Sequence, residues 1–263
     1  MKPPPFVLSI AGSDSSACAG IQMDNRAIEA CGAHPLNVLT AITVQTPDGV
    51  IASEVVSTVS FVQQLEGVLK SFPVAAMKSG MLGSAAIVAA LAEVLEKYPQ
   101  IPYVLDPVCQ STSGTALLDT EGISQIRQRL LLRAQLVTPN LDELRLLVQA
   151  DDYNANTPRE VIAGAIAQQY GCAVLLKGGH GESIESTDEL YFPNGKREAF
   201  SAPRIQSRNT RGTGCALSAL IAARLAHGDA MEIAVATAKQ RLSEGLVQQA
   251  KVSWLGAGPA FGG

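Results

Sequence analysis

Short apolar runs that fit buried β-strands alternate with helical patterns along almost the whole chain, and this alternation limits the possible folds most. Strands are expected at 6–12, 36–44, 75–82, 103–108, 136–139 and 173–179. Helices are expected at 20–31, 61–72, 84–98, 121–134, 141–149, 158–170, 213–226 and 229–248. Strands separated by helices pair in parallel, with the helices on both faces of the sheet. The sequence therefore predicts an α/β fold with a mostly parallel sheet covered on both faces.

The stretch 186–205 interrupts this pattern. It alternates polar and apolar residues around Asn194-Gly195, a dipeptide favoured in hairpin turns. We therefore expect a β-hairpin that adds antiparallel strands at one edge of the sheet. The sequence contains no recognisable linker, repeat or low-complexity stretch, so residues 1–263 are expected to form a single domain.

The composition argues against several classes of function. A net charge of −4 disfavours nucleic acid or an anionic membrane as the main partner, and 5% aromatic residues disfavour a base-stacking surface. The sequence has no apolar run of the ~20 residues that a membrane span requires. Its cysteines form no C-x-x-C pair, which fits reduced thiols in the cytoplasm: Cys18, Cys31, Cys109, Cys172 and Cys215. A cytoplasmic protein is expected.

Small and polar residues gather where the expected strands end. The carboxyl ends of parallel strands share one edge of the sheet, and ligands bind there in open α/β folds. The residues in question are Gly12-Ser13-Asp14, Gln45, Gly80-Met81, Asp106, Asn140 and Lys177-Gly178-Gly179. Their clustering predicts a ligand site at this edge.

The segment NTRGTGC at 209–215 precedes a helix. Glycines at 212 and 214 allow backbone N–H groups to converge on one point, and the helix adds its positive end. Such a turn could stabilise a transferring phosphoryl group, although a purely structural turn fits equally well. Cys215 lies in the first helical turn, where a thiolate would be favoured and its pKa lowered. The alternative is that Cys215 is a small core residue.

Three further polar residues fit phosphate chemistry, each with a structural alternative. Asp106 and Glu143 offer the oxygen ligands that Mg²⁺ prefers. Asn140 and Glu143 also have the spacing of a helix-capping box. Lys177 could reach a phosphate or be an ordinary surface lysine. His180 is expected to be a solvated loop histidine rather than a catalytic base.

Two residues suit a flat heterocycle. The Gln45 amide offers one acceptor and one donor in a plane, which matches the edge of an aminopyrimidine. Met81 could lie against a ring, although a core methionine is the commoner case. These residues favour a planar nitrogen heterocycle over a sugar as the ligand.

Seven segments in order resemble one family: SIAGSDSSACAGIQMD, LTAITVQT, KSGMLG, LDPV, TPNLDEL, LLKGGHG and NTRGTGCALSA. Together they are similar, over about residues 6–250, to the bacterial hydroxymethylpyrimidine/phosphomethylpyrimidine kinases, which belong to the ribokinase-like superfamily. The resemblance implies a three-layer α/β/α sandwich with a ribokinase-like fold. It also implies two ATP-dependent phosphorylations in thiamine biosynthesis. The first acts on 4-amino-5-hydroxymethyl-2-methylpyrimidine, and the second acts on its monophosphate. A homodimer, Mg²⁺ and room for a monovalent cation are further implications.

The resemblance also implies roles for particular residues. The substrate side would comprise Gln45, Met81, Asp24, Gly12, Val44 and Val108. ATP would be bound by Lys177, Asn140, Thr210 and Asn209, and Mg²⁺ would be held through water by Asp106 and Glu143. The catalytic turn would comprise Gly212, Thr213, Gly214 and Cys215. Cys215 stands where the sugar kinases of the superfamily carry a catalytic Asp, and it would accept the proton of the hydroxymethyl group.

The chain also departs from the family pattern. Ser15, Ala17 and Cys18 replace Pro, Gly and Gly, Cys109 replaces the usual Met, and Arg211 replaces a frequent His. These changes leave substrate preference open. A pyridoxal or pyridoxine kinase of the same fold is the main alternative, because some of these kinases use a cysteine near the position of Cys109. A non-catalytic pyrimidine-binding protein is a further alternative.

Overall fold

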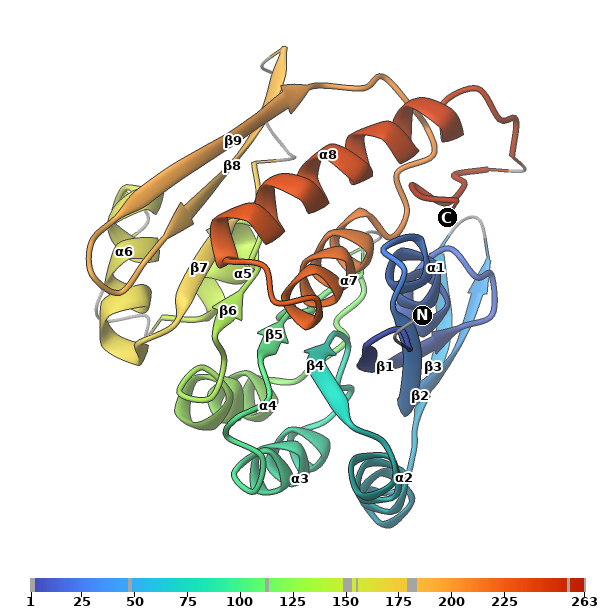
Figure 1. The fold of residues 1–263 in the computed structure, drawn as a ribbon, viewed down its shortest axis with the longest axis vertical. Helices are drawn as coiled ribbons and strands as arrows, with labels where there is room; N and C mark the ends of the chain where they lie inside the picture. The colour runs from blue at the N-terminus through green and yellow to red at the C-terminus, as the bar shows by residue number, and fades with distance from the viewer. Residues whose placement is uncertain are drawn as a thin grey trace.

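The computed structural model describes residues 3–46, 49–111, 114–148, 153–154, 156–178, 184–254 and 256–262. Within these residues the chain forms one nine-stranded sheet in the order β3-β2-β1-β4-β5-β6-β7-β8-β9 (Figure 1). The strands are β1 (Phe6–Asp14), β2 (His34–Thr46), β3 (Gly49–Val55), β4 (Val74–Ser79), β5 (Tyr103–Leu105), β6 (Leu136–Val137), β7 (Ala173–Leu176), β8 (Glu185–Tyr191) and β9 (Arg197–Pro203).

The middle of the sheet is parallel and both ends are antiparallel. The strands from β2 to β7 pair in parallel with their neighbours. At one end β3 pairs antiparallel with β2, and at the other β8 and β9 form an antiparallel hairpin beside β7. The prediction of a mostly parallel sheet with a hairpin at its edge is confirmed.

Helices cover both faces of the sheet (Figure 1). One face carries α1 (Gly20–Ala30), α7 (Thr213–Ala226) and α8 (Met231–Gln249), and α7 packs between the other two. The other face carries α2 (Thr58–Ser71), α3 (Ala85–Leu95), α4 (Thr120–Gln125) with the π-helical turn η1 (Ile126–Leu130), α5 (Leu141–Leu146) and α6 (Arg159–Tyr170). The three-layer α/β/α architecture is confirmed.

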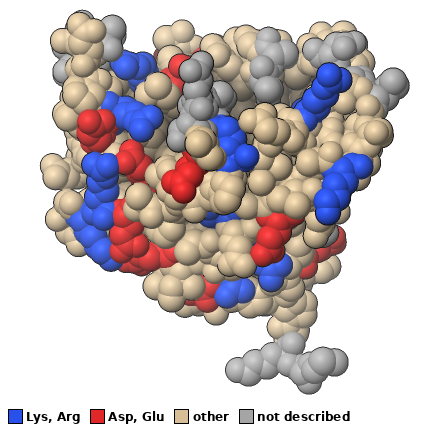
Figure 2. Space-filling view, turned by 90° about the horizontal axis from the view of Figure 1, so that it is seen from above, with Lys and Arg blue, Asp and Glu red and all other residues tan. Residues whose placement is uncertain are grey.

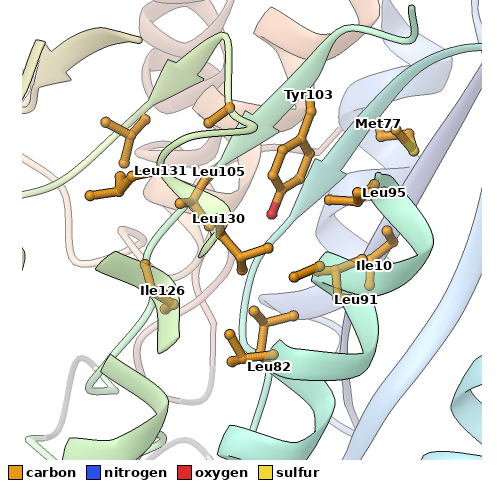
Figure 3. Packing of buried hydrophobic residues seen from close by; sticks show 14 of the residues in the cluster. Ile10, Met77, Leu82, Leu91, Leu95, Tyr103, Leu105, Ile126, Leu130 and Leu131 are labelled. Atoms are coloured by element: carbon orange, nitrogen blue, oxygen red, sulfur yellow. The ribbon is translucent and has the colours of Figure 1, made fainter. Parts of the chain in front are cut away.

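The central strands supply side chains to two separate cores. Successive residues of a strand point to opposite faces of the sheet. In β5, Tyr103 and Leu105 pack against α3 and η1, as Figure 3 shows, whereas Val104 belongs to the core beneath α7. Because the central strands are buried on both faces, their sequences are mostly apolar, which is why they were predictable.

Two elements differ from the sequence-based expectation. Strand β3 was not predicted, because five of its seven residues are exposed and it carries no buried apolar pattern. The helix expected at 121–134 instead consists of the short α4 followed by η1. Neither difference changes the central part of the sheet.

The outer surface mixes charges of both signs. Figure 2 shows basic and acidic side chains interspersed on the face seen from above. Among the described residues, no helix is both long enough and apolar enough to cross a membrane.

Candidate active site

A lysine and two carboxylates from three different segments meet beside the carboxyl ends of the central strands. Asp106 follows β5, Lys177 follows β7, and Glu143 lies in the first turn of α5. The Lys177 Nζ lies 3.0 Å from Asp106 Oδ1 and 3.4 Å from Glu143 Oε2. The parallel sheet therefore brings together side chains that are far apart in the sequence.

Asp106 is the centre of this cluster. Its side chain is almost fully buried, and Thr138 and Ser218 donate to its two carboxylate oxygens at 3.1 and 3.3 Å. Ser218 lies on α7, so the first turns of this helix are tied directly to the acidic cluster. A Cβ added to Gly214 would lie 3.3 Å from Lys177 Nζ, so the helix start packs closely against the lysine.

The three charged groups influence one another's protonation. Burial alone would raise the pKa of Asp106, but the ammonium groups of Lys177 and Lys78 hold it below its usual value. Burial raises the pKa of Glu143, and Lys177 offsets only part of this effect. Burial opposes the charge of Lys177, yet Asp106 and Glu143 raise its pKa above the ordinary range. Lys177 is therefore a permanent cation at neutral pH.

Glu143 forms the helix-capping box that was one of the two roles expected for it. The Asn140 side chain accepts from the Glu143 N–H, and the Glu143 side chain accepts from the Asn140 N–H, each at 2.8 Å. This reciprocal capping box starts α5 and confirms the structural alternative. It also fixes the Glu143 carboxylate close to Lys177.

The glycine turn before α7 requires its glycines. Gly212 caps the helix with φ +76°, in the left-handed region that disfavours other residues. A Cβ at this position would collide with the carbonyl oxygen of Cys18, so the loop after β1 packs closely on the turn. Thr213 and Gly214 follow in the first helical turn, whose amides have no partner within the helix. The turn can therefore present these amides to an anion.

Cys215 does not have the lowered pKa expected at a helix start. Burial raises the pKa of its thiol to about 11, and the carboxylates of Asp24 and Asp106 add to this effect. Lys78 acts in the opposite direction but does not outweigh them. The expected thiolate is therefore wrong for this structure, in which Cys215 is a neutral thiol at neutral pH.

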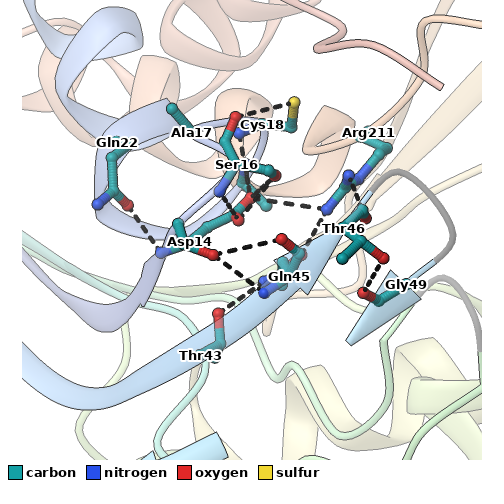
Figure 4. A network of polar contacts seen from close by, with 12 residues as sticks. Asp14, Ser16, Ala17, Cys18, Gln22, Thr43, Gln45, Thr46, Gly49 and Arg211 are labelled. Atoms are coloured by element: carbon teal, nitrogen blue, oxygen red, sulfur yellow. Dashed lines mark hydrogen bonds and ion pairs between the residues drawn. The ribbon is translucent and has the colours of Figure 1, made fainter. Parts of the chain in front are cut away.

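Gln45 lies at the far end of β2, held by a polar network (Figure 4). Its Nε2 donates to Thr43 Oγ1 at 3.0 Å, and its Oε1 accepts from Arg211. Arg211 also donates to the Thr46 carbonyl oxygen at 3.0 Å and lies 3.8 Å from Asp14 Oδ2. The amide is therefore fixed beside the segment that leads into the glycine turn.

Of the other residues expected on the substrate side, only some lie close to one another. Gly12 and Met81 are adjacent, since a Cβ on Gly12 would lie 3.1 Å from the Met81 sulfur. The expectation for Val44 has to be corrected. Thr43 and Gln45 share a face of β2, whereas Val44 lies between them in the sequence and is 51% exposed. Alternation along the strand turns Val44 away from Gln45. Val108 is half-buried just beyond β5.

Asp24 is a second correction. It is fully buried, and both of its carboxylate oxygens lie 2.9 Å from Lys78 Nζ, while Ser9 also donates to it. The Asp24 carboxylate is thus committed to an ion pair between α1 and β4 and is not available to a substrate. Lys78 was not singled out from the sequence, although a lysine in a buried strand is itself a signal, because a buried cation requires a partner.

Two of the ATP-side residues beyond Lys177 have structural partners, namely Asn140 in the capping box and Asn209. Asn209 is buried, and its side chain forms hydrogen bonds with the backbone of Gln249, Val252 and Gly258 in the C-terminal segment. The expectation that this side chain contacts ATP is therefore a further correction. Thr210 is exposed next to Asn209. The expected loop residues Gly179 and His180 lie outside the described residues.

The donor set fits a magnesium ion held partly by a nucleotide. Among the described residues, no group of three or more metal-binding side chains occurs. Asp106 and Glu143 nevertheless offer two carboxylates near one point, both close to Lys177. Mg²⁺ in such sites takes one or two carboxylates and completes its shell with water and phosphate oxygens. The residues therefore fit this ion but do not form a complete protein cage for it.

The fold and this edge define a kinase with a ribokinase-like fold. The sequence pattern of phosphomethylpyrimidine kinases matches residues 14–260, and the chain belongs to this family. The hydroxymethylpyrimidine/phosphomethylpyrimidine kinase of Salmonella typhimurium is 40% identical over 243 residues, which cover 92% of this chain and 90% of that protein. Bifunctional thiamine-biosynthesis proteins also match, and the chain spans about half of their length.

Solved structures agree with this assignment. The phosphomethylpyrimidine kinase of Clostridium difficile superposes with a TM-score of 0.78 and is 33% identical, covering 91% of this chain and 98% of that one. A pyridoxal kinase of Bacillus subtilis in complex with ADP has a TM-score of 0.85 and 27% identity, covering 97% and 96%. The two activities thus share the fold, and sequence identity favours the pyrimidine kinases. Membership of a kinase family implies ATP as the phosphoryl donor.

Proposed function

We propose that this protein phosphorylates 4-amino-5-hydroxymethyl-2-methylpyrimidine and then its monophosphate, with ATP as donor, in thiamine biosynthesis. Relatives of about 40% identity carry this activity in their names. The observation that carries the proposal is the placement of Lys177 and two carboxylates against the start of α7. This is the arrangement of charge that phosphoryl transfer needs, because the reaction depends on alignment and neutralisation.

The two ends of the site have separate tasks in this proposal. Gln45 binds the amino and ring-nitrogen edge of the pyrimidine, with Met81 and Gly12 against the ring. Lys177 neutralises the ATP phosphates, and the amides of Gly212, Thr213 and Gly214 stabilise the transferring group. The pyrimidine hydroxyl must then meet the terminal phosphorus above Asp106. Asn140 and Thr210 remain candidates for contacts with ATP.

Asp106 and Glu143 would hold Mg²⁺ together with the nucleotide phosphates. The ion would neutralise phosphate charge when bound. The residues' own contribution is the pair of carboxylates that the capping box and Thr138 keep in place. Nearby cations hold the pKa of Asp106 below its usual value, so this carboxylate is ionised at neutral pH.

Cys215 is proposed to accept the proton of the hydroxymethyl group in the first transfer. The second acceptor is a phosphate monoester, which is already ionised near neutral pH and needs no base. Since the pKa of Cys215 is about 11, only a small fraction of the thiol is ionised at pH 7. The first transfer should therefore depend on pH, whereas the second should not.

Product analysis tests the function directly. The purified protein is incubated with ATP, Mg²⁺ and either the pyrimidine alcohol or its monophosphate, and the products are separated by anion exchange. Monophosphate and then diphosphate are expected, and Lys177→Met should remove both, because the phosphate charge is then unopposed. If the unaltered protein forms neither product, the proposal is wrong.

A pyridoxal kinase activity is the second candidate, favoured by the structural match to such kinases. A pyridoxal ring presents a phenolic oxygen and a ring nitrogen in place of the aminopyrimidine edge. Cys109, the residue that suggested this alternative, is almost fully buried, and burial raises the pKa of its thiol to about 12. A coupled assay with each alcohol in parallel separates the two activities.

The protein is further proposed to form a homodimer through the outer edge of the sheet. Ile42, Val44 and Ile51 on β2 and β3 leave more than half of their side chains exposed. β3 is also an edge strand, whose unpaired backbone groups favour contact with another chain. A second copy is the proposed occupant of this apolar edge.

A further inference from the structure

Arg211 joins three parts of the molecule that meet at the proposed pyrimidine end of the site. Its backbone N–H donates to the Gly258 carbonyl at 3.2 Å, and its carbonyl accepts from the Ala260 N–H at 2.9 Å. Its side chain extends to the end of β2, where it donates to Gln45 Oε1 and to the carbonyl oxygen of Thr46 (Figure 4). The C-terminal segment thus anchors the arginine, and the arginine contacts the glutamine.

The charge of Arg211 is balanced where it lies. Its side chain is 13% exposed, and Asp14, which is 1% exposed, lies 3.8 Å away. The Asp14 carboxylate also accepts from the backbone N–H groups of Ser16, Cys18 and Ala19. The guanidinium is therefore held by groups on both sides of the site and is not a free surface cation.

Together, Arg211 and Thr43 dictate which way the Gln45 amide faces. An arginine can only donate, so it must face the amide oxygen. The Thr43 hydroxyl donates to the Ser13 carbonyl at 2.9 Å, which leaves its lone pairs to accept from the Gln45 amide nitrogen. If the Gln45 amide were rotated by half a turn, its NH₂ group would face the Arg211 guanidinium, and two donors would meet. Its oxygen would then face the Thr43 hydroxyl oxygen, whose hydrogen is already donated to Ser13. Only one orientation satisfies both neighbours.

In that orientation the Gln45 amide keeps one lone pair on Oε1 and one hydrogen on Nε2. An aminopyrimidine needs these two groups, an acceptor for its amino group and a donor for the adjacent ring nitrogen. We propose that Arg211 is a specificity-determining positioning residue, which fixes the Gln45 amide in the order that an aminopyrimidine requires. This inference rests on the proposed function. Arg211 itself acts through Gln45 and needs no contact with the substrate.

The test is a double-mutant cycle on Arg211 and Gln45. KM for the pyrimidine alcohol and KM for ATP are measured for the unaltered protein, Arg211→Met, Gln45→Ala and the double variant. Arg211→Met is expected to raise the pyrimidine KM roughly tenfold, since a hydrogen bond from a charged donor is lost, and to leave the ATP KM unchanged. In the Gln45→Ala background the same change should have no further effect.

Two additional variants exclude a general effect on the fold. Arg197→Met removes an arginine that pairs with Glu189 on the hairpin and should leave both KM values unchanged. Arg211→Lys keeps the charge but replaces the two guanidinium nitrogens that contact Thr46 and Gln45 with a single nitrogen, so it should reproduce much of the Arg211→Met effect. Thermal unfolding verifies that each variant is folded. If Arg211→Met does not fold, Arg211→Lys takes its place in the cycle.

Each outcome decides between specific alternatives. Additive effects of the two substitutions, or equal rises in both KM values, would show that Arg211 does not act through Gln45 and would overturn the inference. A fall in pyrimidine KM would also overturn it, because Arg211 would then compete with the substrate for Gln45. If the unaltered protein phosphorylates pyridoxal but no pyrimidine, the proposed function fails and this inference fails with it.

Discussion

Ala17 holds a backbone conformation that usually belongs to glycine. Its φ is +55°, and among the described residues no other non-glycine residue has a positive φ. An alanine in this region is strained by ~1–2 kcal/mol, and a glycine would relieve that strain. Part of the gain is lost because glycine also has more conformational freedom in the unfolded chain. We expect Ala17→Gly to raise the free energy of unfolding by about 0.5–1 kcal/mol, measured by urea denaturation. Ala89→Gly, in the interior of α3, is the control and should lower the free energy of unfolding instead, because glycine in a helix costs conformational entropy.

Cys215 determines the pH dependence expected for the first phosphorylation. Its folded pKa is about 11, and the deprotonated form is the proposed base, so the active fraction increases tenfold per pH unit below that value. The rate with the alcohol should therefore rise from pH 6.5 to 9, whereas the rate with the monophosphate should stay nearly level. Single-turnover rates with each acceptor measure this difference.

The same experiment with Cys215→Ala completes this prediction. The variant should lose the rise with pH and slow the first transfer by roughly a hundredfold or more, the usual contribution of a general base, while the second transfer changes little. Equal losses in both transfers would mean that Cys215 contributes packing at the start of α7 rather than proton transfer.

At the scale of elements, the Asp24–Lys78 pair joins α1 to β4 beneath the site. Both side chains are fully buried. Asp24→Asn should lower the free energy of unfolding by about 3–5 kcal/mol, because it leaves the Lys78 charge without a partner. The double variant Asp24→Leu, Lys78→Met should recover most of this loss. Urea denaturation measures both effects, and retained pyrimidine KM in the double variant would exclude a substrate contact by Asp24.

The elements that the sequence predicted are those whose pattern reflects burial. Strands buried on both faces and amphipathic helices carry such a pattern, so the order of the layers was predictable. Strand β3 was missed because it is mostly exposed and owes its place to pairing with β2. The π-helical turn η1 was also missed, because hydrophobic spacing does not distinguish it from an α-helical turn.

For the whole molecule, the gathering of polar residues at one edge of the sheet was predictable, and their individual contacts were not. Asp106 and Lys177 do meet at one edge, as expected for residues at the ends of parallel strands. The orientation of Val44, the burial of Asp24 and the raised pKa of Cys215 depend on neighbours from distant segments. The partners Thr43, Ser218 and Lys78 were missed for the same reason.

The proposed homodimer is the prediction that concerns the whole molecule. Ile42 and Ile51 are 55% and 69% exposed on adjacent strands at the outer edge of the sheet, and exposed apolar side chains grouped in this way usually mark an interface. Light scattering after gel filtration should give twice the chain mass of 27.5 kDa. Ile42→Lys with Ile51→Lys should weaken association roughly a hundredfold or more, because two desolvated charges replace two buried apolar groups. Val161→Lys on α6, a side chain 50% exposed far along the sheet, is the matched control and should leave the mass unchanged. If the unaltered protein is a monomer, the proposed homodimer does not exist. If the variant with both lysines is still a dimer, the interface lies elsewhere on the molecule.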